Sequence, residues 1–317
     1  MICSFNKYLK HLLLSGLLVF KAGLFVSGIF AQDPVMSQFM FGAVYSNPAH
    51  AGIGEYSRIM AGHRNQWPGV ENAAQTIYVS ADTYVDALSG GVGLHIMHDK
   101  IADGQISELS ADLIYSHPVK ISPSVEMVPG IGFSFVQKKY SPGDPSMPSL
   151  ESKVRSKIDV NAGMALSWRE QIYLSFAAHH LSRASDSYSG ESKAVPVQWN
   201  VQGQIYLDFT RGYYNKVPFS LTPGFMYFSQ GRTEYLAIGT NGRYSMFIAG
   251  AWLRSSPVNK AEALIWVAGV DMGRWRAVYS YDMKLASLNN SFGSTGAHEI
   301  TMALRLSDIK RRRWSAQ

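Results

Sequence analysis

The chain has 317 residues, of which 46% are hydrophobic, 12% are aromatic and only 16% are charged. A charged fraction well below the roughly 25% of ordinary soluble domains, combined with many aromatic residues, excludes an intrinsically disordered chain. Beyond residue 31 no apolar run reaches the roughly 18–20 residues that a membrane-spanning helix needs, so a helical membrane protein is excluded as well.

Residues 1–31 have the features of a secretory signal peptide. Lys7 and Lys10 give the segment a positive start, an apolar run follows over residues 12–20, and Ala31 is a suitable last residue before cleavage. An N-terminal membrane anchor is the less favoured alternative, because the apolar run is too short to span a bilayer. We therefore expect the chain to be exported.

Removal of this segment changes the charge and the cysteine content. It takes three of the 29 basic residues and none of the 23 acidic ones, so the formal charge falls from +6 to +3, and it also takes the only cysteine, Cys3. Four of the remaining positive charges lie together at residues 310–313, in a basic C-terminal tail over residues 308–317. The rest of the chain is close to neutral, which argues against binding of nucleic acid.

Residues 32–56 show neither alternation nor high charge. Apolar and aromatic residues from Met36 to Tyr45 are followed by Asn47-Pro48. This segment is predicted to be a periplasmic lead-in that packs against the domain after it, or a plug in the mouth of that domain.

From residue 57 onward the chain alternates between apolar and polar residues, which is typical of β-strands with two different faces. The clearest case is residues 197–209, where Val197, Trp199 and Val201 share one face and Gln198 and Asn200 share the other. We predict fourteen strands of this kind, at residues 57–66, 73–83, 90–99, 105–117, 124–138, 157–168, 171–181, 196–210, 217–229, 233–241, 244–254, 261–271, 274–284 and 297–307.

Alternation fits a soluble β-sandwich and a membrane barrel equally, but three other features favour the barrel. The segments have at least the roughly 9–11 residues that a strand needs to cross a bilayer. Aromatic residues lie at the strand ends, as interfacial belts require; they are Tyr115, Tyr140, Trp168, Trp199, Trp252 and Trp275. An unbroken series of hairpins over residues 57–307 suits one closed sheet. The predicted fold is all-β: an antiparallel transmembrane β-barrel of about 14 strands, similar in size to the FadL barrels, in the outer membrane.

The connections are of two kinds. Short turns are predicted at residues 168–171, 241–243 and 271–274, where Asn241-Gly242 is a strong hairpin sequence. Longer polar loops are predicted at residues 139–156, 182–195, 255–260 and 285–296. With an even number of strands, both termini and the short turns lie on the periplasmic side and the long loops lie outside.

No pattern of residues points to catalysis, a metal or a cofactor. His95 and His98 are three apart on a strand and therefore face opposite ways, and His179-His180 is predicted to be a polar pair at the barrel rim. The chain has no H-E-x-x-H, G-x-S-x-G or P-loop sequence. We therefore predict a non-catalytic protein without a metal or cofactor.

Charged residues on the predicted inward face could select ions in a channel or could pair with one another. These residues are Glu108, Asp112, Asp208, Arg274, Arg276, Asp282, Glu299 and Arg305. Because neither sign predominates, the prediction is a network of salt bridges that fills the lumen.

The most distinctive residues lie at the predicted mature N-terminus. Gln32 to Phe41 reads Q-D-P-V-M-S-Q-F-M-F, and residues 47–52 read N-P-A-H-A-G. Two further blocks are Arg64-Asn65-Gln66-Trp67, and Gly91-Val92-Gly93-Leu94 leading into Asp99-Lys100-Ile101. Together these blocks resemble the PorP/SprF family of Bacteroidetes outer-membrane proteins. The sequence departs from the family pattern at Gly42, His50 and Ala102.

The resemblance implies a part in type IX protein secretion and, in gliding species, in delivery of surface adhesins. It implies four partners: outer-membrane lipid, the secretion machinery, a secreted cargo with a C-terminal sorting domain, and a periplasmic peptidoglycan-binding protein. The outer loops would hold the cargo, and the N-terminal motif and basic tail would face the periplasmic partner.

The residues that carry the resemblance are expected to be structural or to contact a partner. They are Gln32, Asp33, Pro34, Ser37, Phe39, Met40, Asn47, Pro48, Ala49, Gly52, Arg64, Gln66, Trp67, Asp99 and Lys100. Arg64 is expected to bond carbonyl groups of the N-terminal segment, and Trp67 to anchor a strand end at the membrane interface. The alternative function is a transporter or diffusion channel for a small molecule. An outer-membrane enzyme is a more distant third.

Overall fold

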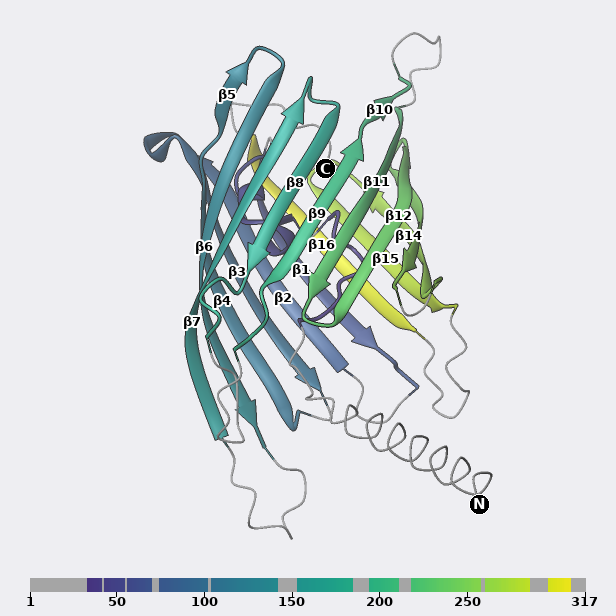
Figure 1. Ribbon diagram of the computed structural model, residues 1–317. Coiled ribbons are helices and arrows are strands. Elements are labelled where there is room, and N and C mark those ends of the chain that lie inside the picture. The colour runs from purple at the N-terminus through teal and green to yellow at the C-terminus, as the bar shows by residue number, and fades with distance from the viewer. Residues whose placement is uncertain are drawn as a thin grey trace, which may run out of the picture. The chain divides into compact units, whose positions relative to one another are not determined.

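Fourteen long strands form one closed antiparallel sheet in the described part of the chain (Figure 1). The computed structural model describes residues 33–41, 43–54, 56–69, 74–101, 104–141, 153–184, 194–210, 218–257, 260–285 and 296–308. The strands are β1 (Tyr56–Gln66), β2 (Ala74–Val85), β3 (Gly90–Ile101), β4 (Ile106–Ser116), β6 (Val125–Tyr140), β7 (Lys153–Trp168), β8 (Ile172–His179), β9 (Gln198–Ile205), β11 (Phe219–Gln230), β12 (Thr233–Tyr244), β13 (Phe247–Ser255), β14 (Ala263–Asp271), β15 (Trp275–Lys284) and β16 (Ala297–Asp308).

Each long strand is hydrogen-bonded to a neighbour on both sides. The sheet closes where β1 pairs with β16 and where β9 pairs directly with β11. The short strand β10 (Leu207–Asp208) follows β9 and pairs with β11 as well. A second short strand, β5 (Val119–Ser122), pairs with β6. The predicted all-β barrel of about 14 strands is therefore confirmed, and each predicted segment matches one long strand. Closure satisfies the backbone groups within the sheet, as a lipid environment demands.

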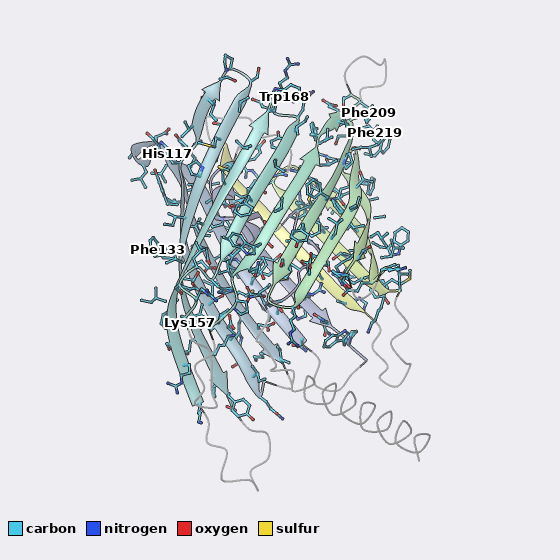
Figure 2. The ribbon with its side chains drawn as sticks, viewed as in Figure 1. His117, Phe133, Lys157, Trp168, Phe209 and Phe219 are labelled. Carbon is cyan, nitrogen blue, oxygen red and sulfur yellow. The ribbon has the colours of Figure 1, made fainter. Side chains whose placement is uncertain are left out.

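The two faces of the sheet have opposite chemistry. Apolar side chains such as Ile238 (57% exposed) and Phe133 (53% exposed) point outward, and Figure 2 shows Phe133 on the outer surface. Polar side chains such as Ser280, His95 and Glu299 point inward and are almost fully buried. This arrangement is the reverse of a soluble sandwich, and it is the arrangement of a barrel whose outer face meets lipid.

Among the described residues, no helix has both the length and the apolar character needed to cross a membrane.

The connections differ between the two ends of the barrel. One end, here called the short-turn end, carries the turn with η2 (Asp86–Leu88) and the turns after β7, β12 and β14. The opposite end, here called the long-loop end, carries the connections after β6, β8, β13 and β15, where longer loops were predicted. The segregation is not complete, because the short connections after β3 and β11 also lie at the long-loop end.

The predicted turn at residues 241–243 is wrong. Asn241, Gly242 and Arg243 are paired within β12, and the chain turns instead at Ser245-Met246, where Ser245 has a φ of 55°. Asn241 points into the lumen, where its Oδ1 accepts a hydrogen bond from Trp252 Nε1 at 3.1 Å. This contact between two strands competes with the local preference of Asn-Gly for a turn.

One residue of the predicted aromatic belt is also misplaced. Trp168, Trp199 and Trp275 are 41–49% exposed and lie on the outer surface, as expected. Trp252 is only 2% exposed and points into the lumen. A bulky apolar partner inside the barrel, Phe39, explains this difference.

A charge on the outward face is expected to destabilise the protein most near the middle of a strand. Ile238→Arg in the middle of β12 should lower the free energy of unfolding by about 2–4 kcal/mol in lipid vesicles, whereas Tyr244→Arg at the end of the same strand should cost about 0–1 kcal/mol. Chemical denaturation of the vesicle-inserted protein measures both values. Equal losses would contradict a lipid-facing band.

Candidate functional site: a segment inside the barrel

The chain that precedes β1 lies inside the barrel. We call residues 33–54 the luminal segment; it contains α2 (Ala43–Ser46) and η1 (Pro48–His50) (Figure 1, purple). Its side chains and backbone contact inward-facing groups of strands around the sheet, from β1 to β16. Many of its residues, including Phe39, Val44 and Ala49, are at most 4% exposed.

Arg64 connects the luminal segment to the barrel wall through a buried charge network. Its Nη2 lies 3.2 Å from Asp282 Oδ2 and its Nη1 lies 3.1 Å from Glu299 Oε2. The same Nη1 donates to the hydroxyl of Ser37, which in turn donates to Asp282. Arg254 adds a second guanidinium, with Nη1 3.2 Å from Asp282 Oδ2. The carbonyl contact expected of Arg64 is thus replaced by contacts with carboxylates and a hydroxyl.

The backbone of the luminal segment completes this network. The N–H of Ser37 donates to Glu299 Oε2 at 2.7 Å, and the N–H of Gln38 donates to Glu299 Oε1 at 3.3 Å. Gln38 Nε2 also donates to the carbonyl of Glu299 at 2.9 Å and to that of Val278 at 3.3 Å. Both oxygens of the Glu299 carboxylate therefore hold the luminal segment in place.

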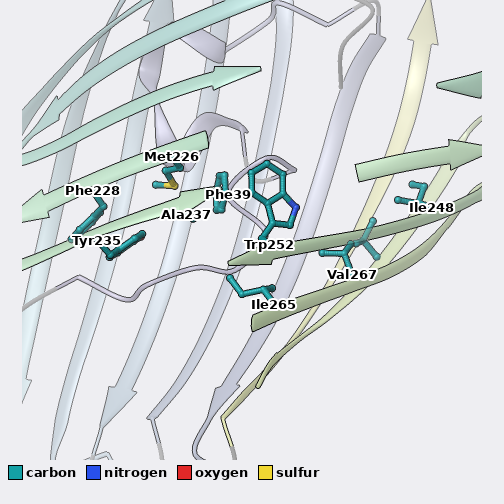
Figure 3. Close-up of a cluster of buried hydrophobic side chains, with 10 residues drawn as sticks. Phe39, Met226, Phe228, Tyr235, Ala237, Ile248, Trp252, Ile265 and Val267 are labelled. Atoms are coloured by element: carbon teal, nitrogen blue, oxygen red, sulfur yellow. The ribbon is translucent and has the colours of Figure 1, made fainter. Parts of the chain in front are cut away.

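Phe39 anchors an apolar cluster on the opposite side of the same segment (Figure 3). Its ring meets that of Trp252 edge to face, with 5.2 Å between the ring centroids. Met226, Ala237 and Ile265, from three different strands, are buried in the same cluster. An aromatic residue of the luminal segment therefore fills space that the strands leave between them.

Asn47 joins the second half of the luminal segment to the wall. Its Oδ1 accepts from the N–H of Ala49 at 2.8 Å and caps η1, while Pro48 begins that helix. Its Nδ2 donates to the carbonyl of Phe176 at 3.0 Å. The Asn-Pro pair therefore sets the local turn and makes a contact with β8.

Glycines on the strands allow the backbone of the luminal segment to approach closely. A Cβ atom on Gly91 would lie 1.9 Å from the carbonyl oxygen of Ala51, and one on Gly130 would lie 2.4 Å from the nitrogen of Ala49. The carbonyl of Ala51 also accepts from the Ser116 hydroxyl at 2.7 Å. Ala49 and Ala51 thus lie against strand backbone at these two glycines.

Asp33 and Gly52, near the two ends of the luminal segment, are held by polar contacts. Gly52 donates its N–H to Asp82 Oδ2 at 2.9 Å, and Arg58 pairs with the other oxygen of Asp82 at 2.7 Å. Asp33 Oδ2 lies 2.8 Å from His180 Nε2.

His180 follows β8 and bridges two carboxylates, because its Nδ1 lies 2.6 Å from Asp159. Burial alone would lower the pKa of His180, but the charge of Asp33 and the hydrogen bonds to both carboxylates raise it to about 10. Burial alone would raise the pKa of Asp33, but the charge of His180 and its hydrogen bond, with smaller contributions from Lys138 and His179, hold it well below its usual range. An imidazolium therefore links the luminal segment to the long-loop end of β7 and β8.

The other predicted residues are not brought together. Pro34 accepts a hydrogen bond from Tyr45 through its carbonyl, and Met40 lines the lumen. Asp99 accepts from the Thr76 hydroxyl at 2.5 Å, whereas Lys100 and Trp67 are exposed. Gln66 pairs with its neighbours at the end of β1. Gln32, Gly42 and Ala102 lie outside the described residues, as do the signal peptide, the basic tail and much of the long loops.

Several residues that hold the luminal segment are not predictable as its partners from the sequence. His179-His180 was predicted to be a rim pair, yet His179 lies 3.3 Å from the carbonyl of Ser46 and His180 bridges Asp33 and Asp159. Asp82, Ser116 and Asn200 also contact the segment. Their inward position was predictable from alternation, but their partners were not.

Five of the eight predicted inward charges form ion pairs in the described part of the chain, as predicted. Asp282 and Glu299 pair with Arg64, Glu108 pairs with Lys138, and Arg276 and Arg305 pair with Asp271. Asp208 and Arg274 are exposed at the short-turn end rather than buried in the lumen. In the part of the chain that the structure covers, no group of three His, Cys, Asp or Glu side chains is arranged to hold a metal ion.

A closed barrel with an apolar exterior, a polar lumen and its own N-terminal segment inside is an outer-membrane protein of the plugged type. The chain belongs to the PorP/SprF family: the model of that family, described as type IX secretion system membrane protein PorP/SprF, matches residues 29–304. The family is one of secretion-system membrane proteins. No curated protein sequence matches the chain.

Several solved outer-membrane proteins are similar in structure. The Acinetobacter baumannii outer membrane protein Omp33 has a TM-score of 0.47 at 7% identity, covering 80% of this chain and all of that one. A Pseudomonas aeruginosa FadL homologue has a TM-score of 0.47 at 11% identity, covering 88% of this chain and 95% of that one. The P. putida toluene transporter TodX has a TM-score of 0.45 at 8% identity, with coverages of 82% and 93%.

Loss of the Arg64 side chain should leave two buried carboxylates without their main counter-charge. We expect Arg64→Met to lower the free energy of unfolding by about 3–5 kcal/mol. Guanidinium titration of the refolded protein in micelles, followed by tryptophan fluorescence, measures the change. The matched control is Arg232→Met, at an exposed turn, which should stay within about 0.5 kcal/mol of the parent protein.

A methyl group on Gly91 should loosen the luminal segment. In a chain that lacks Cys3 and carries Val44→Cys as a reporter, Gly91→Ala should raise the rate of thiol labelling about tenfold, because the added Cβ collides with the Ala51 carbonyl. Gly132→Ala is the control, since its Cβ would make an ordinary contact at 3.6 Å. Equal labelling rates in the two variants would mean that residues 49–51 do not depend on the close approach.

The bridge made by His180 predicts a pH dependence. Because its pKa is raised on folding, its contribution to stability is complete below about pH 6.5 and decreases as the pH rises toward 10. The difference in free energy of unfolding between the parent protein and His180→Asn should therefore shrink across that range. A difference that stays constant between pH 6.5 and pH 10 would contradict the charged bridge.

Proposed function

We propose that this protein is a non-catalytic component of type IX secretion that binds a secreted surface cargo at one end and a periplasmic partner at the other. The observation that supports this most is the occupied lumen. A protein whose N-terminal segment is bound on every side by its own strands is suited to present surfaces at its two ends rather than to pass solutes.

The energetics of the luminal segment support this closed role. Leaving the lumen would strip the Glu299 carboxylate of two backbone donors and the Asp282 carboxylate of the Ser37 hydroxyl. It would also uncover the cluster around Phe39. Buried polar groups that lose their partners are costly, so the segment is a permanent part of the barrel and not a gate that opens at random.

The two ends are assigned by their connections. The C-terminal end of β16 lies at the short-turn end, whereas Asp33 lies at the long-loop end beside His180. Because short turns are typical of the periplasmic side of outer-membrane barrels, we take the long-loop end to face outward and assign the cargo with its C-terminal sorting domain to that end. The short-turn end then faces the periplasm, together with the basic tail at residues 308–317, and we assign the peptidoglycan-binding partner to it. The residues of the N-terminal motif have, in this proposal, a structural role in closing the lumen.

Affinity purification of the tagged protein from gently solubilised outer membranes tests the proposal. We expect mass spectrometry to recover a large surface protein with a C-terminal sorting domain. Replacing residues 182–195 with a Gly-Ser linker should remove that cargo, whereas replacing the short turn at residues 272–274 should not. Loss of the cargo on changing the short turn alone would refute the assignment of the two ends.

The alternative, a channel for small molecules, makes a different prediction. The purified protein in a planar bilayer should show no steady ion conductance if the luminal segment closes the barrel. A steady conductance in the parent protein, without recovery of any cargo, would refute the secretion role and favour the channel.

A further inference from the structure

A pocket remains inside the lumen at the short-turn end, beside the luminal segment. Met40 and Phe41 of that segment form one wall, and Arg243 of β12 and Arg276 of β15 form part of another. The strand side chains that line it include the buried, inward-facing Ser220, Asn241 and Ile248, so the pocket belongs to the lumen. None of the described residues that line it is acidic.

The arginines of this region compete for one carboxylate. Arg276 donates to Asp271 Oδ2 from Nε at 3.0 Å and from Nη2 at 2.8 Å, and Arg305 donates to both oxygens at 2.9 Å. Asp271 is thus already bound by two forked guanidinium groups. Arg243 Nη1 is 3.7 Å from Asp271 Oδ2, which is beyond hydrogen-bond distance.

Arg243 is therefore the guanidinium with capacity for a further acceptor. Within the described residues, its hydrogen bond runs from Nε to the carbonyl of Ser245 at 3.0 Å, and its side chain is 44% exposed. That bond engages Nε, and Arg243 is one of the residues that line the pocket. A planar fork of this kind is matched by an oxyanion.

We propose that this pocket binds a carboxylate of a polypeptide segment that enters the barrel from the short-turn end. Arg243 would bind the carboxylate, and the Met40 and Phe41 wall would take an apolar side chain next to it, since methionine adapts its shape to different partners. A position inside the lumen favours a peptide over the phosphate of a membrane lipid. The inference rests on the proposed function only for the side of the membrane from which the segment arrives.

Fluorescence anisotropy with the purified protein in micelles tests this site without cargo or secretion. The probe is a fluorescein-labelled, C-terminally amidated peptide Gly-Gly-Phe-Glu, and its matched control is the Gly-Gly-Phe-Gln peptide. We expect the Glu peptide to bind about tenfold more tightly than the Gln peptide, and Arg243→Gln to remove that difference. Arg232→Gln, at the other end of the barrel, should leave it unchanged.

Three results would overturn the proposal. Equal binding of the two peptides by the parent protein would show that no carboxylate is recognised. An unchanged difference in Arg243→Gln would place the recognition elsewhere. The third result concerns competition by two small anions, inorganic phosphate and acetate. If phosphate displaces the Glu peptide at about one tenth of the concentration at which acetate does, the site is a phosphate site and not a carboxylate site.

Discussion

The structure depends on the burial of Arg64 between Asp282 and Glu299. A barrel in lipid must turn its polar side chains inward, and charges that become buried there need partners because an isolated buried charge is very costly. Three strands supply this ion-pair network, but Ser37 and the backbone of Gln38 complete it. The luminal segment and the barrel wall are therefore parts of one folding unit.

The rest of the luminal segment follows from the space that this network leaves. Phe39 and Trp252 fill the lumen on one side, and small residues allow backbone to rest on backbone at Gly91 and Gly130 on the other. The pyrrolidine rings of Pro34 and Pro48 fix the backbone φ angle at these two positions before the segment docks, which lowers the conformational entropy lost when the segment becomes ordered. A short segment with only two single-turn helices can therefore hold one conformation inside the barrel.

The closed lumen separates the two ends of the protein into two chemical environments. At the long-loop end, a histidine bridges two carboxylates and ties Asp33 to β7 and β8. At the short-turn end, arginines surround Asp271 and line an open pocket beside Phe41. In the function proposed above, these are the two surfaces that would meet the secreted cargo and the periplasmic partner.

The barrel is predictable from the order of residues alone, because alternation over fourteen segments dictates which side chains face lipid and which face inward, as in residues 197–209. The sequence also locates the distinctive N-terminal residues, since their types and order are visible without any contact. The partners of these residues follow from contacts in the folded chain: Arg64 meets Ser37 and two carboxylates, Trp252 turns inward to Phe39, and Asn241-Gly242 stays in a strand. These outcomes depend on groups more than 200 residues apart, or on neighbouring strands, and local sequence preferences do not encode the energy of such contacts.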